Sequence, residues 1–519
     1  MKIAASFLSL LLLPLFLSAQ PGKSITTDPV EILDQYYEQA LSEWNVPGFS
    51  VVVIDSGRVV LSQGYGDLGN LDRGNTRPDG ETLYAIASNT KAFISTALAI
   101  LVDEGKIDWD DPVQKYLPYF ELYDEYVSTH TTIRDLLCHR VGLGTFSGDA
   151  IWYKNEKSAE QIIRQMKHVP QSFDFRAGYG YSNLMFITAG EVIRVVAGQP
   201  WDEFVHDRIF EPLGMDRTRT HVADLAAMEN VATPHKPGPK GNMAVAPAPW
   251  ENSGAAGGIW SSTNDLAKWL QLHFNRGVAP NGDTIFSRRN QLVTQTPHNS
   301  FVVSDGARET YPTRNFAAYG LGWGLSDLHG EKVVAHGGGY DGMYSRVTMV
   351  PERGIGIIVL TNSMRGISTP ITFYTLDLLL SGETPTDYSA AGLPGQHRRD
   401  LAFQKRMDDL ANTRSRKIEH TLKPKQVAGQ YHAPIYGNIR IERDKKQLSL
   451  HFEQAPALTA DLVPFGPDTY EIDWREEHAW FTFGTVEILH DGDAPTGLRF
   501  RVPNDDIFFE EIEPVRRED

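Results

Sequence analysis

A serine and a lysine stand three residues apart in Ser88-Asn-Thr-Lys91, at the start of an apolar stretch that is predicted to be helical. Residues at this spacing lie on one face of a helix, within reach of each other. A lysine whose pKa is depressed by burial can remove the serine proton, and a helix N-terminus supplies N–H groups that stabilise an oxyanion. The pair is therefore predicted to be the nucleophile and base of an acyl transfer. The alternative is a capping serine beside a solvated lysine, but the chain holds no other Ser-x-x-Lys, and this one opens an apolar helix.

A tyrosine and an asparagine form a second candidate pair in Tyr181-Ser-Asn183, on a loop before a predicted helix. A tyrosine held over the nucleophile near cations would have a pKa below its usual value of about 10 and would shuttle protons. Asn183 would donate a hydrogen bond to a substrate carbonyl. A half-buried tyrosine and a helix cap explain the same pattern without chemistry. The motif therefore indicates a catalytic role only in combination with the other two motifs.

The third motif, His336-Gly-Gly-Gly339, follows a short strand predicted at 333–335. Glycines at a strand end let a substrate approach the backbone, and the N–H of Gly339 would form an oxyanion hole with that of Ser88. His336 and Gly338 are predicted to contact the substrate as well. The alternative is a glycine turn with an incidental histidine. A dinucleotide site is excluded, because a strand and not a helix is predicted to follow the glycines.

The elements that must position these motifs are strands at both ends of the first 380 residues and helices between them. Residues 49–54 and 59–62 flank Asp55-Ser-Gly57 and predict a β-hairpin. Further strands are predicted at 333–335, 345–350 and 355–360. Helical periodicity predicts helices at 34–44, 86–104, 132–139, 159–166, 183–196, 201–209 and 263–274. We therefore expect an α+β domain over residues 20–383 whose terminal strands meet.

The composition changes at about residue 384. Residues 384–426 contain Pro and Gly and are predicted to be a linker with a charged helix at 397–410. Apolar and polar residues then alternate at 438–443 and 447–452, which is typical of strands. Residues 427–519 are therefore predicted to form a small all-β barrel or sandwich.

Charge and cysteine content exclude some classes of function. The 66 Asp and Glu residues outnumber the 49 Lys and Arg residues, so the formal net charge is −17. An acidic chain without a basic face repels phosphates, and no nucleic-acid partner is expected. Cys138 is the only cysteine, so no intramolecular disulfide can form.

The N-terminus has the pattern of a secretory signal. Met1-Lys2 precedes an apolar run at 7–17, and Leu17-Ser-Ala19 offers a cleavage site after Ala19. The run is shorter than the ~20 apolar residues that a membrane span needs, so no stable span is expected. Residues 1–19 are therefore predicted to be a signal peptide and the mature protein to be periplasmic or secreted.

In their order along the chain, the three motifs resemble those of the serine β-lactamase and penicillin-binding-protein superfamily, S-x-x-K, S-D-N and K-T-G. The Tyr-x-Asn form is typical of the class C β-lactamase-like branch, which also holds D-peptidases and carboxylesterases. Four further segments look like family sequence: Leu137–Leu143, Ile209–Met215, Gly257–Ser262 and Tyr319–Gly324. The resemblance covers residues 32–380. The C-terminal part is similar to the lipocalin-like β-domain appended to some of these hydrolases.

The resemblance implies a β-lactamase/transpeptidase-like antiparallel sheet flanked by helices and an acyl-enzyme on Ser88, with no metal and no organic cofactor. Lys91 and Tyr181 would share the base and acid roles, Asn183 would bind substrate, and the Gly339 N–H would bind the oxyanion. One residue departs from the pattern. His336 stands where β-lactamases usually carry lysine, so the cation that meets a substrate carboxylate would be only partly charged at neutral pH.

These observations favour a serine hydrolase that cleaves an amide or ester bond in a small-molecule or peptide substrate, such as a D-amino acid peptide or a carboxylic ester, with β-lactams less favoured. The alternative is a turnover-deficient relative that binds peptidoglycan fragments or amphiphiles through its β-domain. An α/β-hydrolase and a zinc metalloprotease are disfavoured, because G-x-S-x-G and H-E-x-x-H are absent. The sequence leaves the oligomeric state open.

Overall fold

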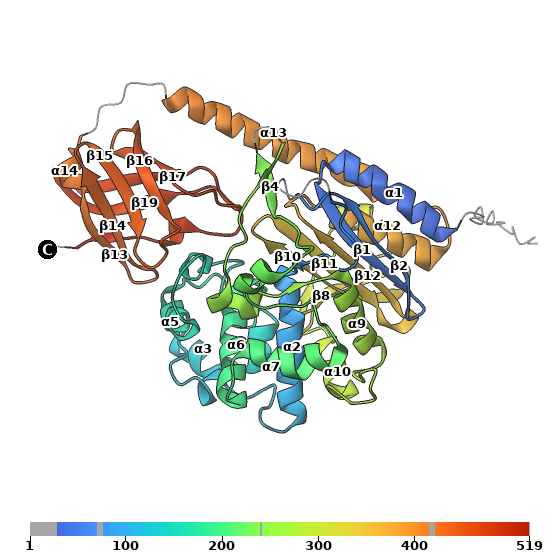
Figure 1. Cartoon of the computed structure of the whole chain (residues 1–519). Coiled ribbons are helices and arrows are strands. Elements are labelled where there is room, and N and C mark those ends of the chain that lie inside the picture. The colour runs from blue at the N-terminus through green and yellow to red at the C-terminus, as the bar shows by residue number, and fades with distance from the viewer. Residues whose placement is uncertain (1–27, 70–75, 239–240, 415–420, 518–519) are drawn as a thin grey trace, which may run out of the picture.

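A computed structural model describes residues 28–69, 76–238, 241–414 and 421–517 (Figure 1). The predicted signal peptide, residues 1–19, lies outside the described residues. The described chain forms an α+β body and a separate β-barrel joined by one long helix, which confirms the predicted fold class. Among these residues, none of the helices combines the length and apolarity of a membrane span.

The α+β body is built on an eight-stranded antiparallel sheet in the order β2-β1-β12-β11-β10-β9-β8-β7. Its strands are β1 (Gly48–Asp55), β2 (Arg58–Gly66), β7 (Asn299–Phe301), β8 (Ala317–Tyr319), β9 (Gly324–Leu328), β10 (Glu331–Tyr340), β11 (Met343–Val350) and β12 (Ile355–Thr361). The first and last strands, β1 and β12, pair directly, as the sequence predicted. The two short pairs β3 (Tyr84–Ala85) with β6 (Trp260–Ser261) and β4 (His235–Gly238) with β5 (Gly241–Ala244) lie outside this sheet.

Apolar side chains alternate along the central strands and build a core on each face of the sheet. On β1, Val51 and Val53 face one core, and Val52 and Ile54 face the other. Such alternation is the geometry of an extended chain buried on both sides. Helices α1 (Pro29–Trp44) and α12 (Ser368–Ser381) cover the first face (Figure 1).

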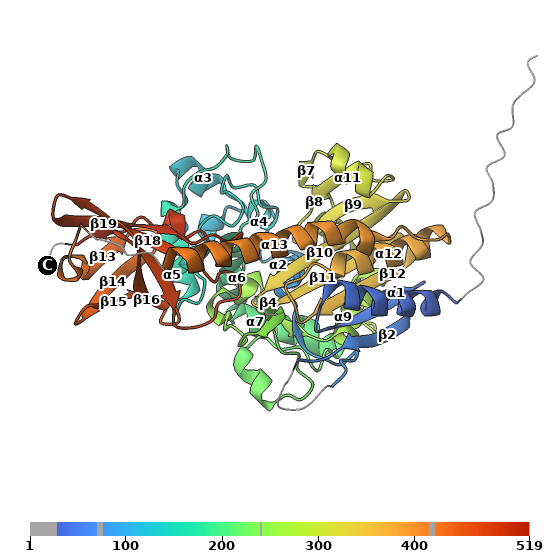
Figure 2. The same cartoon turned by 90° about the horizontal axis from the view of Figure 1, so that it is seen from above.

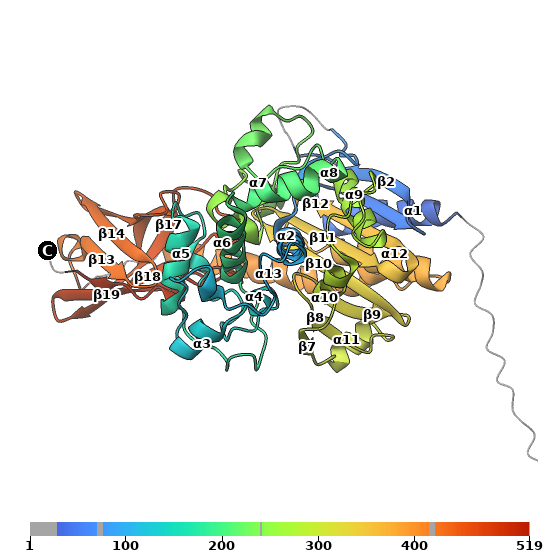
Figure 3. The ribbon, with the colours of Figure 1, turned by 90° about the horizontal axis from the view of Figure 1, so that it is seen from below.

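The second face carries most of the helices. Helix α2 (Thr90–Asp103) runs through their centre and is seen end-on in Figure 3 with its neighbours around it. The other helices of this body are α3 (Glu125–His130), α4 (Ile133–Leu137), α5 (Ala159–Gln165), α6 (Asn183–Ala197), α7 (Trp201–Val205), α8 (Glu211–Leu213), α9 (Thr263–Phe274), α10 (Arg288–Thr294) and α11 (Asp305–Thr310). Because every residue of α2 from Thr90 to Leu101 is buried, even its polar side chains must find partners inside the protein.

The predicted linker helix is longer and better packed than the sequence indicated. Helix α13 (Tyr388–Arg414) crosses from α12 to the barrel (Figure 2). Its Ser389 Oγ accepts a hydrogen bond from Trp44 Nε1 at 2.9 Å, and its Asp400 pairs with Arg365 at 2.9 Å. The N-terminal part of this helix therefore packs on the α+β body, although the helix as a whole is strongly charged.

After the short helix α14 (Pro424–Val427), the C-terminal strands form a closed barrel. They are β13 (Gly429–Ala433), β14 (Gly437–Asp444), β15 (Gln447–Phe452), β16 (Thr459–Gly466), β17 (Thr469–Trp474), β18 (Thr485–Asp491), β19 (Ala494–Arg501) and β20 (Val515–Arg516). The Glu511 carboxylate docks this barrel on the α+β body, because it accepts hydrogen bonds from Ser147 Oγ at 2.5 Å and Gly148 N–H at 2.6 Å. Lys236 Nζ adds a bond to Glu477 at 2.6 Å.

The glycine motif lies within a strand and not in a turn after it. Residues 336–340 continue β10 and pair with β11, so that Gly338 lies opposite Ser345. A Cβ atom on Gly338 would stand 2.4 Å from the carbonyl oxygen of Ile86 and 2.4 Å from Ser345 Oγ. The absence of a side chain therefore lets β10 approach the turn that carries Ser88.

We predict that Gly338→Ala destabilises the protein by about 1–3 kcal/mol, because the added methyl group must push β10 away from that turn. Thermal unfolding of the purified variant measures the effect. Gly337→Ala is the matched control, since the nearest atom to its Cβ lies 3.9 Å away. Equal unfolding midpoints for the two variants would contradict the close approach.

Candidate active site

Ser88 sits in a single 3₁₀ turn, Ala87–Asn89, between β3 and α2. Ala87 has a φ of 50°, a left-handed conformation that costs a residue with a side chain about 1–2 kcal/mol. Two hydrogen bonds hold the turn on β11: Asn89 Nδ2 donates to Ser345 Oγ at 2.8 Å, and Ser345 Oγ donates to Ile86 O at 2.6 Å. The nucleophile is thus fixed by the turn and by the sheet, not by the helix alone.

Lys91 is completely buried, and its Nζ contacts three oxygen atoms. These are Ser88 Oγ at 3.0 Å, Asn183 Oδ1 at 2.7 Å and the carbonyl of Ala256 at 2.7 Å. Burial lowers the pKa of Lys91 to about 7, so much of it is a neutral amine at neutral pH. A neutral amine has two N–H groups, and the amide and carbonyl oxygens can only accept hydrogen bonds. Its lone pair therefore points to the Ser88 hydroxyl, as a general base requires.

Asn183 connects Lys91 to a buried carboxyl group, that of Asp149. Its Nδ2 donates to Asp149 Oδ2 at 2.6 Å, which fixes its oxygen toward Lys91. Asp149 Oδ1 also accepts from Trp152 Nε1 at 2.9 Å, and burial raises the Asp149 pKa to about 8. The Asn183 amide nitrogen has a second N–H beyond the one bonded to Asp149, so its predicted hydrogen bond to a substrate stays a prediction. Asp149, which lies 34 residues before Asn183, was not predicted from the sequence.

Tyr181 lies over Lys91, whose Nζ is 4.8 Å from the centre of its ring. The expectation of a lowered tyrosine pKa is wrong: burial raises the pKa of Tyr181 well above its usual value, although the Ser88 hydroxyl acts in the opposite direction. The buried hydroxyl makes no hydrogen bond of normal geometry to the described residues. Tyr181 is therefore a protonated donor at neutral pH and is free to give a proton to a substrate atom.

His336 is neutral and not partly charged as the sequence suggested. Burial, together with the nearby Lys91, lowers its pKa to about 3. Its Nδ1 lies 2.5 Å from the Gly337 carbonyl and must donate, so Nε2 accepts from the Tyr319 hydroxyl at 2.8 Å. This histidine therefore presents no positive charge to a substrate.

Gly339 lies beyond the last residue of β10 that pairs with β9, which is Ala335. It lines one cavity together with Ser88, Tyr181, Asn183 and His336. Gly338 lines only the outer groove and packs on the nucleophile turn. The structure thus brings the predicted residues of all three motifs together, and their catalytic roles stay predictions.

The cavity at Ser88 has a volume of about 190 Å³, and the barrel forms part of its wall. The α+β body contributes the aromatic residues Phe146, Trp152 and Trp250, and the barrel contributes Trp480, Asp506 and Ile507. No motif in the sequence marked these residues, and those of the barrel join the site only when the barrel docks.

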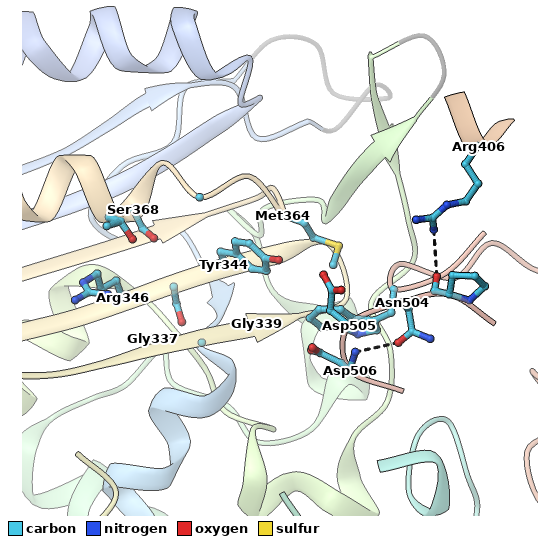
Figure 4. A pocket seen from close by; sticks show the side chains of 16 residues that line it. Gly337, Gly339, Tyr344, Arg346, Met364, Ser368, Arg406, Asn504, Asp505 and Asp506 are labelled. Atoms are coloured by element: carbon cyan, nitrogen blue, oxygen red, sulfur yellow. Dashed lines mark hydrogen bonds between the residues drawn. The ribbon is translucent and has the colours of Figure 1, made fainter. Parts of the chain in front are cut away.

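A larger groove of about 660 Å³ adjoins the cavity and shares Gly337, Gly339, Trp480 and Asp506 with it. Figure 4 shows that Asp505 and Asp506 lie beside Gly339, whereas Arg346 and Ser368 lie farther along the groove. The site therefore has a small inner chamber and a long outer channel.

Comparisons with known proteins identify the family of the chain. The family model Beta-lactamase matches residues 33–378. The chain therefore belongs to the Beta-lactamase family, a family of serine hydrolases. It is 28% identical over 500 residues to the unguisins hydrolase ungD' of Aspergillus campestris (strain IBT 28561). This alignment covers 86% of this chain and 85% of the relative.

Two solved structures share the fold. The octameric penicillin-binding protein homologue from Pyrococcus abyssi has a TM-score of 0.60 and 23% identity, over 94% of this chain and all of that one. A D-stereospecific amidohydrolase from Streptomyces sp. has a TM-score of 0.55 and 25% identity, over 69% of this chain and 99% of that one. The first match includes the barrel, so the two-body architecture is itself shared.

We predict that the rate of Ser88 acylation rises with pH and levels off above about pH 7, because only the neutral form of Lys91 can accept the serine proton. The rate of labelling by a fluorophosphonate, measured from pH 5 to 9, tests this. In Lys91→Arg the side chain stays charged, so labelling should slow by about 100-fold or more and lose the step near pH 7. A wild-type rate that is independent of pH over this range would rule out Lys91 as the base.

We predict that Asp149→Asn slows labelling and moves its pH midpoint below that of the wild type. The two carboxyl oxygens of Asp149 accept hydrogen bonds from Trp152 and Asn183, whereas an asparagine has only one side-chain oxygen. The Asn183 amide therefore loses its fixed orientation. The ionised fraction of Asp149, whose pKa is about 8, also acts to raise the Lys91 pKa, and its removal lets burial lower the Lys91 pKa further. An unchanged midpoint and rate in the same labelling assay would show that Asp149 has no influence on Lys91.

Proposed function

We propose that the protein is a serine hydrolase that forms an acyl-enzyme on Ser88 and cleaves an amide or ester bond. The observation that carries the proposal is the 3.0 Å contact between Ser88 Oγ and a buried lysine whose two other partners can only accept hydrogen bonds. Export from the cytoplasm, expected from residues 1–19, is part of this proposal.

The geometry supports a two-step reaction. Lys91 takes the Ser88 proton while Oγ attacks the carbonyl carbon, and the N–H groups of Ser88 and Gly339 bind the resulting oxyanion. When the C–N or C–O bond breaks, the leaving atom receives a proton from the Tyr181 hydroxyl, which Lys91 then reprotonates. Water attacks the acyl-enzyme by the reverse proton path and restores Ser88.

The substrate class is narrowed by what surrounds Ser88. No lysine or arginine lines the inner cavity among the described residues, and His336 is neutral. A substrate carboxylate, such as that of a β-lactam or a peptide C-terminus, finds no cation there. Peptides or esters are therefore favoured. The likeness to a relative named as an unguisins hydrolase supports hydrolysis, and the likeness to a D-stereospecific amidohydrolase supports amide cleavage.

A fluorophosphonate tests the nucleophile directly. Its P–F bond breaks and a P–O bond to Ser88 Oγ forms, so intact-protein mass should show one adduct on the wild type and none on Ser88→Ala. An adduct that persists in Ser88→Ala would contradict the assignment. A folded wild type that takes no adduct would favour the non-hydrolytic alternative, in which the barrel binds a ligand.

A further inference from the structure

The barrel places one acidic side chain in the catalytic cavity. Asp506 lies between β19 and the 3₁₀ turn Phe509–Glu511 and lines the cavity with Ser88 and Gly339. It also lines the outer groove, where Figure 4 shows it near Gly339. Asn504 Oδ1 holds this segment, because it accepts from the backbone N–H of Asp506 at 3.0 Å and of Ile507 at 2.6 Å. The Glu511 carboxylate clamps the same segment onto Ser147 and Gly148. These hydrogen bonds therefore hold the Asp506 segment in a defined position.

Within the described parts of the chain, no hydrogen bond or ion pair reaches the Asp506 carboxyl group. Burial and the adjacent Asp505 raise its pKa to about 7, as expected for a carboxyl group that lacks a compensating charge. It is close enough to Asp149 and Tyr181 to act on the pKa of both. An acid in this state is stabilised by a cation that enters the cavity.

The remaining walls also suit a cation. The described residues give the cavity two acidic side chains, Asp149 and Asp506, and no lysine or arginine, and its histidine, His336, is neutral. Its aromatic side chains are Phe146, Trp152, Tyr181, Trp250 and Trp480. Aromatic faces attract cations through their quadrupole, and indole rings do so most strongly. Lys91 does not cancel this character, because it is enclosed beneath Tyr181 and its pKa is near 7.

The size of the cavity limits what the cation can be attached to. A volume of about 190 Å³ corresponds to roughly six water molecules, which is below the usual range of ligand sites. The chamber therefore holds a small group next to the scissile carbonyl. The rest of a longer substrate would continue into the groove of about 660 Å³.

We propose that Asp506 binds a positively charged nitrogen of the substrate, so that the enzyme prefers acyl groups with a free amine close to the scissile carbonyl. This inference rests on the proposed function and adds the substrate class to it. The barrel then supplies specificity, whereas the α+β body supplies the chemistry.

Three matched acyl donors test the preference: alanine p-nitroanilide in both enantiomers, N-acetylalanine p-nitroanilide and propionyl p-nitroanilide. At pH 7 the α-amine is mostly protonated. The wild type should show the highest kcat/KM for an alanine anilide. Asp506→Asn should lower that value by at least about tenfold and leave the two neutral anilides within about twofold, because a hydrogen bond to a charged group is lost only with the amine. Asp493→Asn, which removes an exposed barrel carboxylate, should leave all values unchanged.

A second measurement uses only the wild type and so does not depend on the folding of a variant. Alaninamide should inhibit hydrolysis of p-nitrophenyl propionate more strongly than propionamide does. Equal inhibition by the two amides would contradict the amine site, and so would an equal loss of activity on all three anilides in Asp506→Asn. In either case, Ser88-dependent turnover of the neutral ester would still support the proposed hydrolase function. If the ester were not turned over, or were turned over equally by Ser88→Ala, both the proposed function and this inference would be wrong.

Discussion

The burial of Lys91 is the constraint on which the active site depends. A charged ammonium group is unfavourable away from solvent, so burial lowers the pKa of Lys91 to about 7. A large share of Lys91 is therefore a neutral amine at neutral pH. The protein does not relieve this cost with a direct ion pair, which would restore the charge and remove the base. It offers two neutral acceptors, and it keeps the Asp149 carboxyl group, whose pKa is about 8, one amide away, behind Asn183. The asparagine thus transmits orientation to the lysine while it separates the two titrating groups.

The same constraint explains several features of the surrounding fold. Lys91 stays dry only if α2 is enclosed, and this helix accordingly runs through the centre of the helices on one face of the sheet. The nucleophile must then emerge from a buried helix, which is why Ala87 adopts a left-handed conformation just before Ser88. Gly338 allows β10 to lie against this turn, and its neighbour Gly339 is thereby brought to the cavity. Strain and close approach are concentrated at one place because the chemistry needs both a dry base and an accessible oxygen.

Local patterns and short motifs were sufficient to predict much of the site. Ser88 and Lys91 are three residues apart, so their contact follows from helical geometry alone, and the meeting of β1 with β12 followed from the placement of strands at the two ends of the domain. Properties that depend on burial were not predictable. Tyr181 and His336 have pKa values that are set by packing in three dimensions, and the glycines of β10 gave a turn-like pattern although they pair with β11. Asp506 stands 418 residues after Ser88 and carries no motif, so only the docked barrel shows that it belongs to the site.

The division of the chain into two bodies also divides the tasks of the site. Residues from the α+β body form the proton path, and each is tied to the sheet or to a buried helix, where small displacements are costly. Residues from the barrel line the cavity and are held by an interface that combines apolar contacts, such as Tyr153 with Phe481, with the hydrogen bonds of Glu511. The proposed proton path runs through Ser88, Lys91 and Tyr181 and uses no residue of the barrel. The charge and shape of the barrel segment at Asp506 can therefore vary while the proton path stays in place, and specificity can change without loss of the reaction.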